Sequence, residues 1–238
     1  MKPQELSERL KKVASYIPEG SRLADIGSDH AKLPCYALER GLIITAVAGE
    51  VNEGPLNAAN RNIRAKGMEE SIHAKLGDGL QVLDGETVDV ITIAGMGGPL
   101  IVRILEDGKK RLGASVQRLI LQPNVASDHV RKWLYDNQWS LIDEQILEED
   151  GHIYEILVAA RSEAPEAAYN KHELEKEMWL GPFLMKQKNS AFELKWSKER
   201  EQLKKVKEQL SKGGNTAALT EKKKKIDQYL IWLEEELS

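Results

Sequence analysis

The residues of this chain whose types and spacing could do chemistry begin with a short segment, LADIGSDHAKLP at positions 23–34. The segment closes an apolar run and opens a helix, and its one glycine lets a ligand approach the backbone closely. Acidic residues flank that glycine, so the loop offers hydrogen-bond acceptors where a phosphate-binding loop would offer amide donors. A cationic ligand therefore suits it better than a phosphate does. The residues expected to bind this ligand are Asp25, Gly27, Ser28, Asp29 and His30.

Two further carboxylates stand at later strand ends and extend the predicted ligand into a nucleoside. Glu50, followed by Val51, ends the second apolar run, where a carboxylate accepts hydrogen bonds from both ribose hydroxyls. Asp78 and Gly79 form a turn after the third run, and an Asp in such a turn can accept the adenine amino group. The nucleoside with a sulfonium and an ammonium group is S-adenosylmethionine, the predicted cofactor. Glu50 also suits NAD, so a NAD-dependent oxidoreductase is an alternative, although the loop lacks the GxGxxG of that class.

The fourth and fifth apolar runs end in residues that suit a substrate site. Glycines in the number found in IAGMGG, residues 93–98, weaken a strand, so they favour close approach of cofactor and substrate. The expected contacts there are Ala94, Gly95, Met96 and Gly97. The fifth run ends in Gln122, Pro123 and Asn124, whose amides could lie beside a reactive base. A strand stopped by proline and followed by an Asn turn explains these residues equally well.

Seven apolar, β-rich runs must position these residues, and most of them alternate with helical stretches. This rhythm predicts an α/β fold, a Rossmann-like seven-stranded sheet whose parallel strands end at one edge. Only a short turn separates the last two runs, so we expect them to pair as an antiparallel hairpin at the sheet edge. An amphipathic helix with Leu6, Leu10 and Val13 precedes the first strand. The seven runs are residues 22–26, 43–48, 72–75, 88–94, 119–121, 141–147 and 154–160.

The sequence changes character after Arg161, where a small, polar, proline-containing connection begins. We place a domain boundary there, between a catalytic domain of residues 1–162 and a helical domain of residues 163–238. Residues 172–210 predict a helix, and a second helix follows the turn at residues 213–215. The second helix has apolar residues at coiled-coil spacing, namely Leu219, Ile226, Leu230, Leu233 and Leu237. The two helices can satisfy each other as an antiparallel coiled-coil hairpin, so we expect a monomer.

Lysines gather on both sides of that turn, at positions 204, 205 and 207 and again at positions 222–225. An antiparallel pairing would bring both groups to the same region of the hairpin, where they could contact RNA phosphates. The alternative is that these lysines form only the solvated face of a coiled coil, balanced by neighbouring glutamates.

Composition excludes several classes of protein. The formal charge of −4 argues against coating nucleic acid by bulk attraction, so RNA binding needs local basic patches. Cys35 is the only cysteine, which rules out an intrachain disulfide and indicates a reducing compartment. No apolar run reaches the roughly 20 residues of a membrane span, and the first residues lack the apolar part of a signal peptide. We expect a cytoplasmic protein without membrane contact, and the histidines suggest no metal site.

The combined motifs resemble the bacterial tRNA adenine-N1 methyltransferases that modify position 22. The matching segments cover the first domain in order, and they are DIGSDHAKLP, GEV with NAANRNI, GDGL, IAGMGG, LQPN and GHIYEI. The resemblance implies a class I Rossmann-like methyltransferase with S-adenosylmethionine as donor and tRNA as substrate. Ala94 departs from it, because some members have cysteine there. A non-catalytic RNA-binding scaffold with a relict Rossmann domain is the other alternative, and the intact acidic positions argue against it.

Methylation at adenine N1 needs alignment more than a strong base, because N1 has a free lone pair. The product is a cation, which a nearby carboxylate would stabilise. We therefore predict Asp29 as a catalytic residue, with His30 orienting the substrate or moving a proton and Asn124 beside the base. His30 could instead make only a structural hydrogen bond at the helix start.

Overall fold

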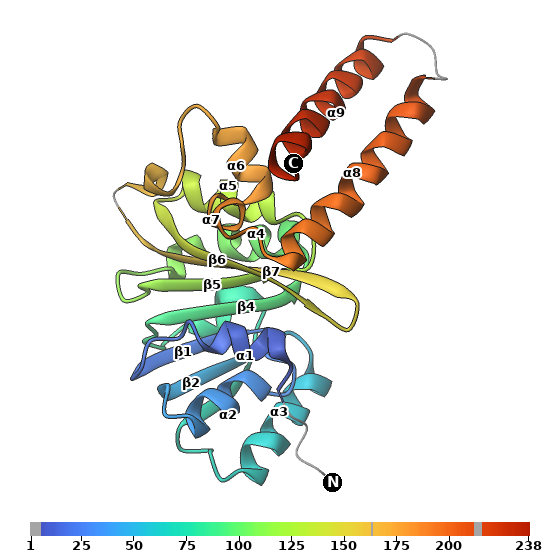
Figure 1. Ribbon diagram of the computed structural model, residues 1–238. Helices are drawn as coiled ribbons and strands as arrows, with labels where there is room; N and C mark the ends of the chain where they lie inside the picture. Colours follow the sequence, from blue (N-terminus) through green and yellow to red (C-terminus); the bar gives the residue numbers. More distant parts are fainter. Residues whose placement is uncertain (1–5, 163, 212–215) are drawn as a thin grey trace.

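Seven strands form one mixed β-sheet in the computed structural model, which describes residues 6–162, 164–211 and 216–238 (Figure 1). The sheet order is β3-β2-β1-β4-β5-β7-β6. The first five strands pair in parallel, whereas β7 is antiparallel to both β5 and β6. The predicted seven-stranded Rossmann-like sheet is thereby confirmed. The strands are β1 (Ser21–Ile26), β2 (Ile43–Glu50), β3 (Ile72–Leu76), β4 (Val90–Met96), β5 (Arg118–Pro123), β6 (Trp139–Glu149) and β7 (His152–Arg161).

The predicted hairpin of the last two strands is also confirmed. β6 pairs with β7 from Trp139 opposite Arg161 to Glu149 opposite His152. Asp150 and Gly151 connect them, with φ of 52° and 77°. Two consecutive residues with positive φ are typical of a type I′ turn, whose twist matches that of the paired strands. The hairpin therefore ends in a tight turn, with β6 at the sheet edge.

Helices cover both faces of the sheet. One core cluster joins side chains of α1 (Glu8–Ala14), α2 (Lys32–Glu39) and α3 (Glu53–Ala65), and a second joins those of α4 (Gly98–Asp107), α5 (Ser127–Asp136) and the 3₁₀ helix η1 (Gly79–Leu83). The neighbours Leu23 and Ala24 of β1 belong to different clusters, as the alternation of side chains along a strand requires. Two further 3₁₀ turns are η2 (Lys109–Arg111) and η3 (Pro165–Ala168). Because β1, β2, β4 and β5 are parallel, their carboxyl ends lie at the same edge of the sheet.

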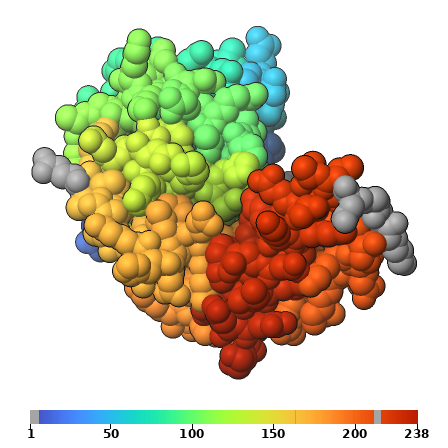
Figure 2. All heavy atoms as spheres, turned by 90° about the horizontal axis from the view of Figure 1, so that it is seen from above, coloured from blue at the N-terminus to red at the C-terminus, as the bar shows by residue number. Residues whose placement is uncertain are grey.

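The C-terminal segment is helical, but its first part is not the single helix predicted for residues 172–210. It consists of α6 (Leu174–Leu180), α7 (Pro182–Gln187) and α8 (Ser190–Ser211), followed by α9 (Ala217–Glu236). Gly181 and Lys188 interrupt it with φ of 93° and 41°. Helices α8 and α9 lie side by side (Figures 1 and 2). The predicted turn at residues 213–215 lies outside the described residues. No helix in the described ranges is long and apolar enough to cross a membrane.

The C-terminal helices pack on the sheet through an apolar cluster that includes Ile146 of β6, Phe192 and Trp196 of α8 and Leu233 of α9. Trp179 of α6 stacks on Tyr229 of α9 with ring centroids 4.1 Å apart. Of the five residues predicted at coiled-coil spacing, three are buried, namely Ile226, Leu230 and Leu233. The coiled-coil geometry itself stays a prediction.

A buried group of charges, here called the Arg131 cluster, also joins the two segments. Arg131 of α5 donates to Glu144 of β6 and to Glu155 of β7, each at 2.6 Å, and Lys195 of α8 pairs with Glu155. Burial would raise the pKa of Glu155, but Lys195 and Arg131 outweigh it and lower that pKa to about 2. A Cβ at Gly181 would lie 2.7 Å from Arg131 Nη2, so only glycine lets the backbone come this close. The break between α6 and α7 therefore accommodates the cluster.

Candidate active site

The loop between β1 and α2 has an unusual backbone. Gly27, Asp29, His30 and Ala31 all have positive φ, between 44° and 70°. Each non-glycine residue in that conformation costs on the order of 1 kcal/mol or more, and such strain gathers at ligand-binding sites. The amides of Gly27 and Ser28 both donate to the carbonyl of Gly49, at 2.9 and 3.1 Å, which ties the loop to the end of β2. The predicted ligand-binding loop is thus held in one strained shape.

Asp25 organises the base of this loop from a buried position. Its two carboxylate oxygens accept hydrogen bonds from the hydroxyls of Ser28 and Thr92, each at 2.6 Å. Burial raises the pKa of Asp25 to about 6, although both hydrogen bonds act to lower it. Near neutral pH Asp25 is therefore a buried carboxylate at the base of the loop, and a cation bound nearby would stabilise its ionised form.

Glu50 places a carboxylate at the end of β2. The residue is buried, and within the described residues its Oε1 has no hydrogen-bond partner. Burial raises the pKa of Glu50, while hydrogen bonds from the backbone of His30 and Asp29 oppose that rise. A buried acceptor without a partner is costly, so it fits a site for ligand hydroxyls. Val51 follows with its side chain 60% exposed, next to that acceptor.

Asp78 and Gly79 lie at the start of η1, beyond the end of β3. Asp78 is exposed, and its amide donates to Gln81 Oε1 at 3.4 Å. Gly79 has φ of 53°, so glycine suits this turn. Both residues line a small cavity together with Arg103 and Arg111. The structure therefore leaves Asp78 accessible to solvent beyond the end of β3.

The end of β4 comes close to the loop after β1. Met96 covers Gly27, because a Cβ on Gly27 would lie 2.3 Å from Met96 Cε. Gly95 has φ of 78°, Ala94 is half-buried before it, and Gly97 precedes α4. The structure thus brings the predicted residues of the loop after β1 and of the end of β4 together.

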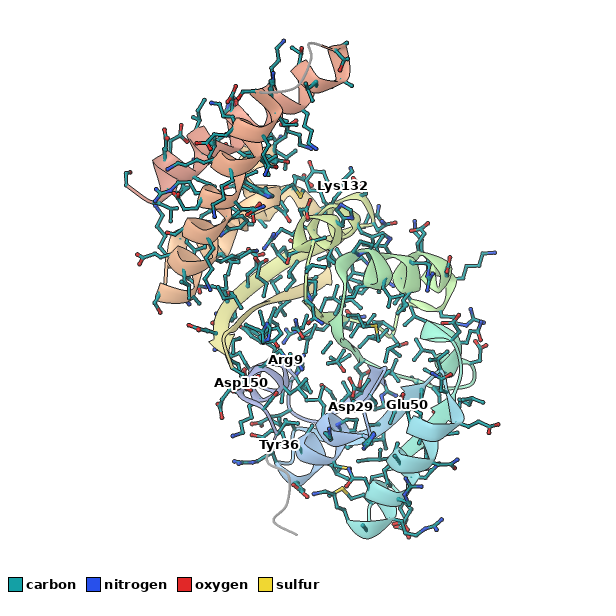
Figure 3. All side chains as sticks on the ribbon, turned by 90° about the vertical axis from the view of Figure 1, so that its right-hand side faces the viewer. Arg9, Asp29, Tyr36, Glu50, Lys132 and Asp150 are labelled. Carbon is teal, nitrogen blue, oxygen red and sulfur yellow. The ribbon has the colours of Figure 1, made fainter. Side chains whose placement is uncertain are left out.

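Asp29 and His30 point into more exposed space than Asp25 does. Asp29 Oδ2 accepts from Lys32 Nζ at 2.8 Å, and this hydrogen bond lowers the pKa of Asp29. His30 Nε2 lies 3.8 Å from Asp29 Oδ1. Figure 3 shows Asp29 and Glu50 in the same region, with Arg9 of α1 above them. The lowered pKa keeps Asp29 ionised at neutral pH and makes it a weaker proton acceptor than an ordinary carboxylate.

Arg9 and Gln122 lie beside these residues as well. The sequence predicts the amide of Gln122 near the reactive base but gives Arg9 no role. Arg9 hydrogen-bonds Gln122 Oε1, and its guanidinium lies 5.0 Å from the ring centroid of Tyr154 on β7. Gln122 is fully buried and also accepts from the amide of Gly95 at 2.9 Å. The available signal was the position of Arg9 on the apolar face defined by Leu6, Leu10 and Val13, where a charge needs a partner. Tyr154 thus contacts Arg9.

Asn124 directly follows β5, next to these residues. Its amide donates to the carbonyl of Met96 at 2.7 Å, and its Oδ1 accepts from Gln122 Nε2 at 3.2 Å. The side chain is exposed at the edge where the strands end. The structure therefore brings Asn124 together with the end of β4. Within the described part of the chain, no three His, Cys, Asp or Glu side chains are grouped to hold a metal ion.

Comparisons with known proteins agree with this architecture. Residues 23–231 match the family model described as tRNA (adenine(22)-N(1))-methyltransferase. A Bacillus subtilis protein of that name is 46% identical over 99% of this chain and 98% of its own length. The crystal structure of the B. subtilis m1A22 tRNA methyltransferase covers 99% of this chain and 100% of its own, with a TM-score of 0.93 and 45% identity. A Streptococcus pneumoniae relative in complex with S-adenosyl-L-methionine has a TM-score of 0.84 and 41% identity, over 98% of this chain and 100% of its own.

Proposed function

The chain belongs to the tRNA (adenine(22)-N(1))-methyltransferase family, and we infer from this membership that it methylates N1 of the adenine at position 22 of tRNA. It is an enzyme that uses S-adenosylmethionine as methyl donor. The observation that carries this function is a family match over residues 23–231, joined to a buried acceptor on Glu50 that has no partner among the described residues. The two alternatives, a NAD-dependent oxidoreductase and a non-catalytic scaffold, lack comparable support.

We propose that the donor lies across the carboxyl ends of β1 and β2. Glu50 Oε1 would accept the ribose hydroxyls, with Val51 beside the nucleoside, and Asp78 and Gly79 would bind the adenine end. The cationic end would lie over the loop after β1 and the end of β4. The residues proposed for that end are Asp25, Gly27, Ser28, Asp29, His30, Ala94, Gly95, Met96 and Gly97.

The residues of this chain then favour transfer by orientation and charge. When bound, the donor supplies an electrophilic methyl carbon, to which the N1 lone pair bonds while the C–S electron pair stays on sulfur. The methylated base carries the positive charge, and Asp29 is ionised because Lys32 lowers its pKa. A fixed carboxylate facing developing positive charge lowers the barrier. We propose that Asp29 supplies this negative charge, that His30 orients the substrate or moves a proton, and that Asn124 lies beside the base.

We propose that residues 163–238 form a tRNA-docking arm on the catalytic domain of residues 1–162, and that the enzyme acts as a cytoplasmic monomer. Lys204, Lys205 and Lys207 are exposed on α8, and so are Lys222, Lys224 and Lys225 on α9. Lys204 pairs with Glu201 and Lys207 with Asp227, which offsets part of this charge. The remaining lysines can contact phosphates without reading sequence.

The decisive experiment is nucleoside mass spectrometry of an unmodified tRNA transcript after incubation with the protein and a labelled donor. We expect labelled 1-methyladenosine, and none from a matched transcript with guanosine at position 22. A labelled nucleoside other than 1-methyladenosine, or equal labelling of both transcripts, would refute the proposed function.

A further inference from the structure

The side-chain amide of Gln122 has only one orientation that its neighbours allow. Two donors, Arg9 Nη1 and the amide of Gly95, meet the same side of that amide. Because two donors need an acceptor, the oxygen Oε1 must face them. The amino group Nε2 then faces Asn124, which directly follows β5.

This orientation determines which atoms Asn124 presents to the site. Gln122 Nε2 donates to Asn124 Oδ1 at 3.2 Å, so the oxygen of Asn124 is turned toward a fixed donor. Asn124 Nδ2 is left pointing away from Gln122, and Oδ1 keeps a second lone pair. The exposed edge of Asn124 therefore offers one donor and one acceptor side by side.

An amide with a donor beside an acceptor matches the Hoogsteen edge of adenine. Its oxygen can accept from the N6 amino group while its nitrogen donates to N7, which is the pairing by which Asn reads adenine in nucleic acids. Because N1 lies on the other edge of the ring, that pairing leaves the N1 lone pair free. Val125, which is 65% exposed, follows Asn124 and would add an apolar surface beside such a base.

We propose that Arg9 and Gln122 are positioning residues that preset Asn124 to bind N6 and N7 of the target adenine, an inference that rests on the proposed function. Arg9 is well placed for this role because α1 is itself fixed. Glu149 on the β6–β7 hairpin accepts from the amide of Glu8 at 2.5 Å, and Tyr154 lies against the Arg9 guanidinium. The N-terminal helix and the terminal hairpin thus both support the orientation of one substrate-binding amide.

The test compares two tRNAs that carry adenosine or 7-deazaadenosine at position 22. The second lacks N7 but keeps N1 and the N6 amino group. For the wild-type enzyme we expect kcat/KM to be about 5- to 10-fold lower on the 7-deaza tRNA, the value of one hydrogen bond. Asn124→Asp keeps the acceptor but removes the donor to N7, so this variant should treat both tRNAs alike.

Substitutions of the positioning residues separate this role from a general structural one. Gln122→Glu keeps acceptors for Arg9 and Gly95 but loses the donor to Asn124, so the ratio between the tRNAs should fall below about 2-fold. Arg9→Leu should also lower the ratio, and Arg9→Lys should restore part of it. Gln117→Glu, the same change at an exposed position before β5, should leave the ratio unchanged. Binding of S-adenosylmethionine, measured by calorimetry, confirms that each variant is folded.

Three results would overturn the inference. Equal kcat/KM on both tRNAs for the wild-type enzyme would show that N7 is not read. A full 5- to 10-fold ratio in Gln122→Glu would remove the role of Gln122. An Arg9→Leu variant with a higher KM for both tRNAs and an unchanged ratio would make Arg9 a phosphate contact instead. Failure of the wild-type enzyme to methylate ordinary tRNA would refute the proposed function itself, and this inference with it.

Discussion

Gly98 lies so close to Ala126 that a Cβ on Gly98 would be 2.1 Å from the Ala126 carbonyl oxygen. The Gly98 amide also donates to the carbonyl of Val125 at 2.8 Å. The loop after β4 and the loop after β5 therefore touch through their backbones, at the place where Met96 and Asn124 meet. The site depends on this contact for its shape.

Gly98→Ala should destabilise the protein by about 2–3 kcal/mol, because the added methyl meets backbone that cannot rotate away. Urea denaturation measures the change. Gly54→Ala is the matched control, since a Cβ on Gly54 of α3 meets nothing within 4 Å. It should leave stability unchanged or raise it by about 0.5–1 kcal/mol. Equal effects of the two substitutions would contradict the close contact.

Asp25→Asn should stabilise the ligand-free protein. The pKa of Asp25 is raised to about 6, so ionisation of this buried group opposes folding. The penalty grows as the pH rises from roughly 4 to 6 and is constant above that. The variant should therefore gain about 1–3 kcal/mol at pH 7 and little at pH 4. Thermal unfolding at several pH values measures the gain, and a gain independent of pH would show that Asp25 does not titrate in this range.

The same substitution should weaken donor binding. Wild-type affinity for S-adenosylmethionine should fall as the pH drops through about 6, because protonation removes the Asp25 charge. Burial also raises the pKa of Glu50, which titrates in the same direction, while Asp29 stays ionised. The affinity of Asp25→Asn for S-adenosylmethionine should thus depend less on pH than that of the wild type, with Glu50 causing the remaining dependence. A variant with wild-type affinity at pH 7 would exclude this electrostatic role.

Glu50→Ala should cost donor binding about 1.5–3 kcal/mol, the value of hydrogen bonds to a charged group. Titration calorimetry with S-adenosylmethionine measures the loss, and NAD should not bind the wild-type protein. Glu53→Ala, a change at an exposed carboxylate at the start of α3, serves as control. Micromolar NAD binding without S-adenosylmethionine binding would reverse the assignment of the cofactor site.

Asp29→Asn should lower turnover on the order of 100-fold at saturating donor, because it removes the charge that faces the cationic product. Asparagine tolerates the positive φ of this position, so the loop should keep its shape. Asp136→Asn removes the carboxylate of another exposed lysine pair and should leave turnover unchanged. Near-normal turnover of Asp29→Asn would move the catalytic role to His30 or Asn124.

Replacing Lys222, Lys223, Lys224 and Lys225 by Gln should raise the KM for tRNA and flatten its dependence on salt, because fewer counterions are released on binding. Donor affinity should not change. Replacing Glu221 and Glu234 by Gln is the opposite control and should not weaken tRNA binding. If tRNA binding by the lysine variant keeps the wild-type dependence on salt, these lysines form only the solvated face of helices α8 and α9.

Patterns local in sequence predicted most of this molecule. The seven strands follow from apolar runs, and the hairpin follows from the short turn around Asp150 and Gly151. The Arg9–Gln122 contact joins residues 113 positions apart, so no local pattern could reveal it. The break at Gly181 was equally hidden, because its cause is the approach of Arg131 from α5. The left-handed conformation of Asp29 and His30 likewise reflects ties to β2 that only the folded loop makes.

The Arg131 cluster makes the C-terminal helices inseparable from the sheet in any dissection of the protein. Lys195 of α8 neutralises Glu155, and Phe183 donates its amide to Glu144 at 3.1 Å. A chain cut after Arg161 would leave both carboxylates facing water, with Arg131 as their only cationic neighbour within the cluster. Loss of tRNA binding in such a fragment would report a damaged β6–β7 hairpin as much as a missing arm. Point substitutions of surface charge leave these contacts intact. They are therefore the appropriate way to distinguish the roles of the catalytic domain and the C-terminal helices.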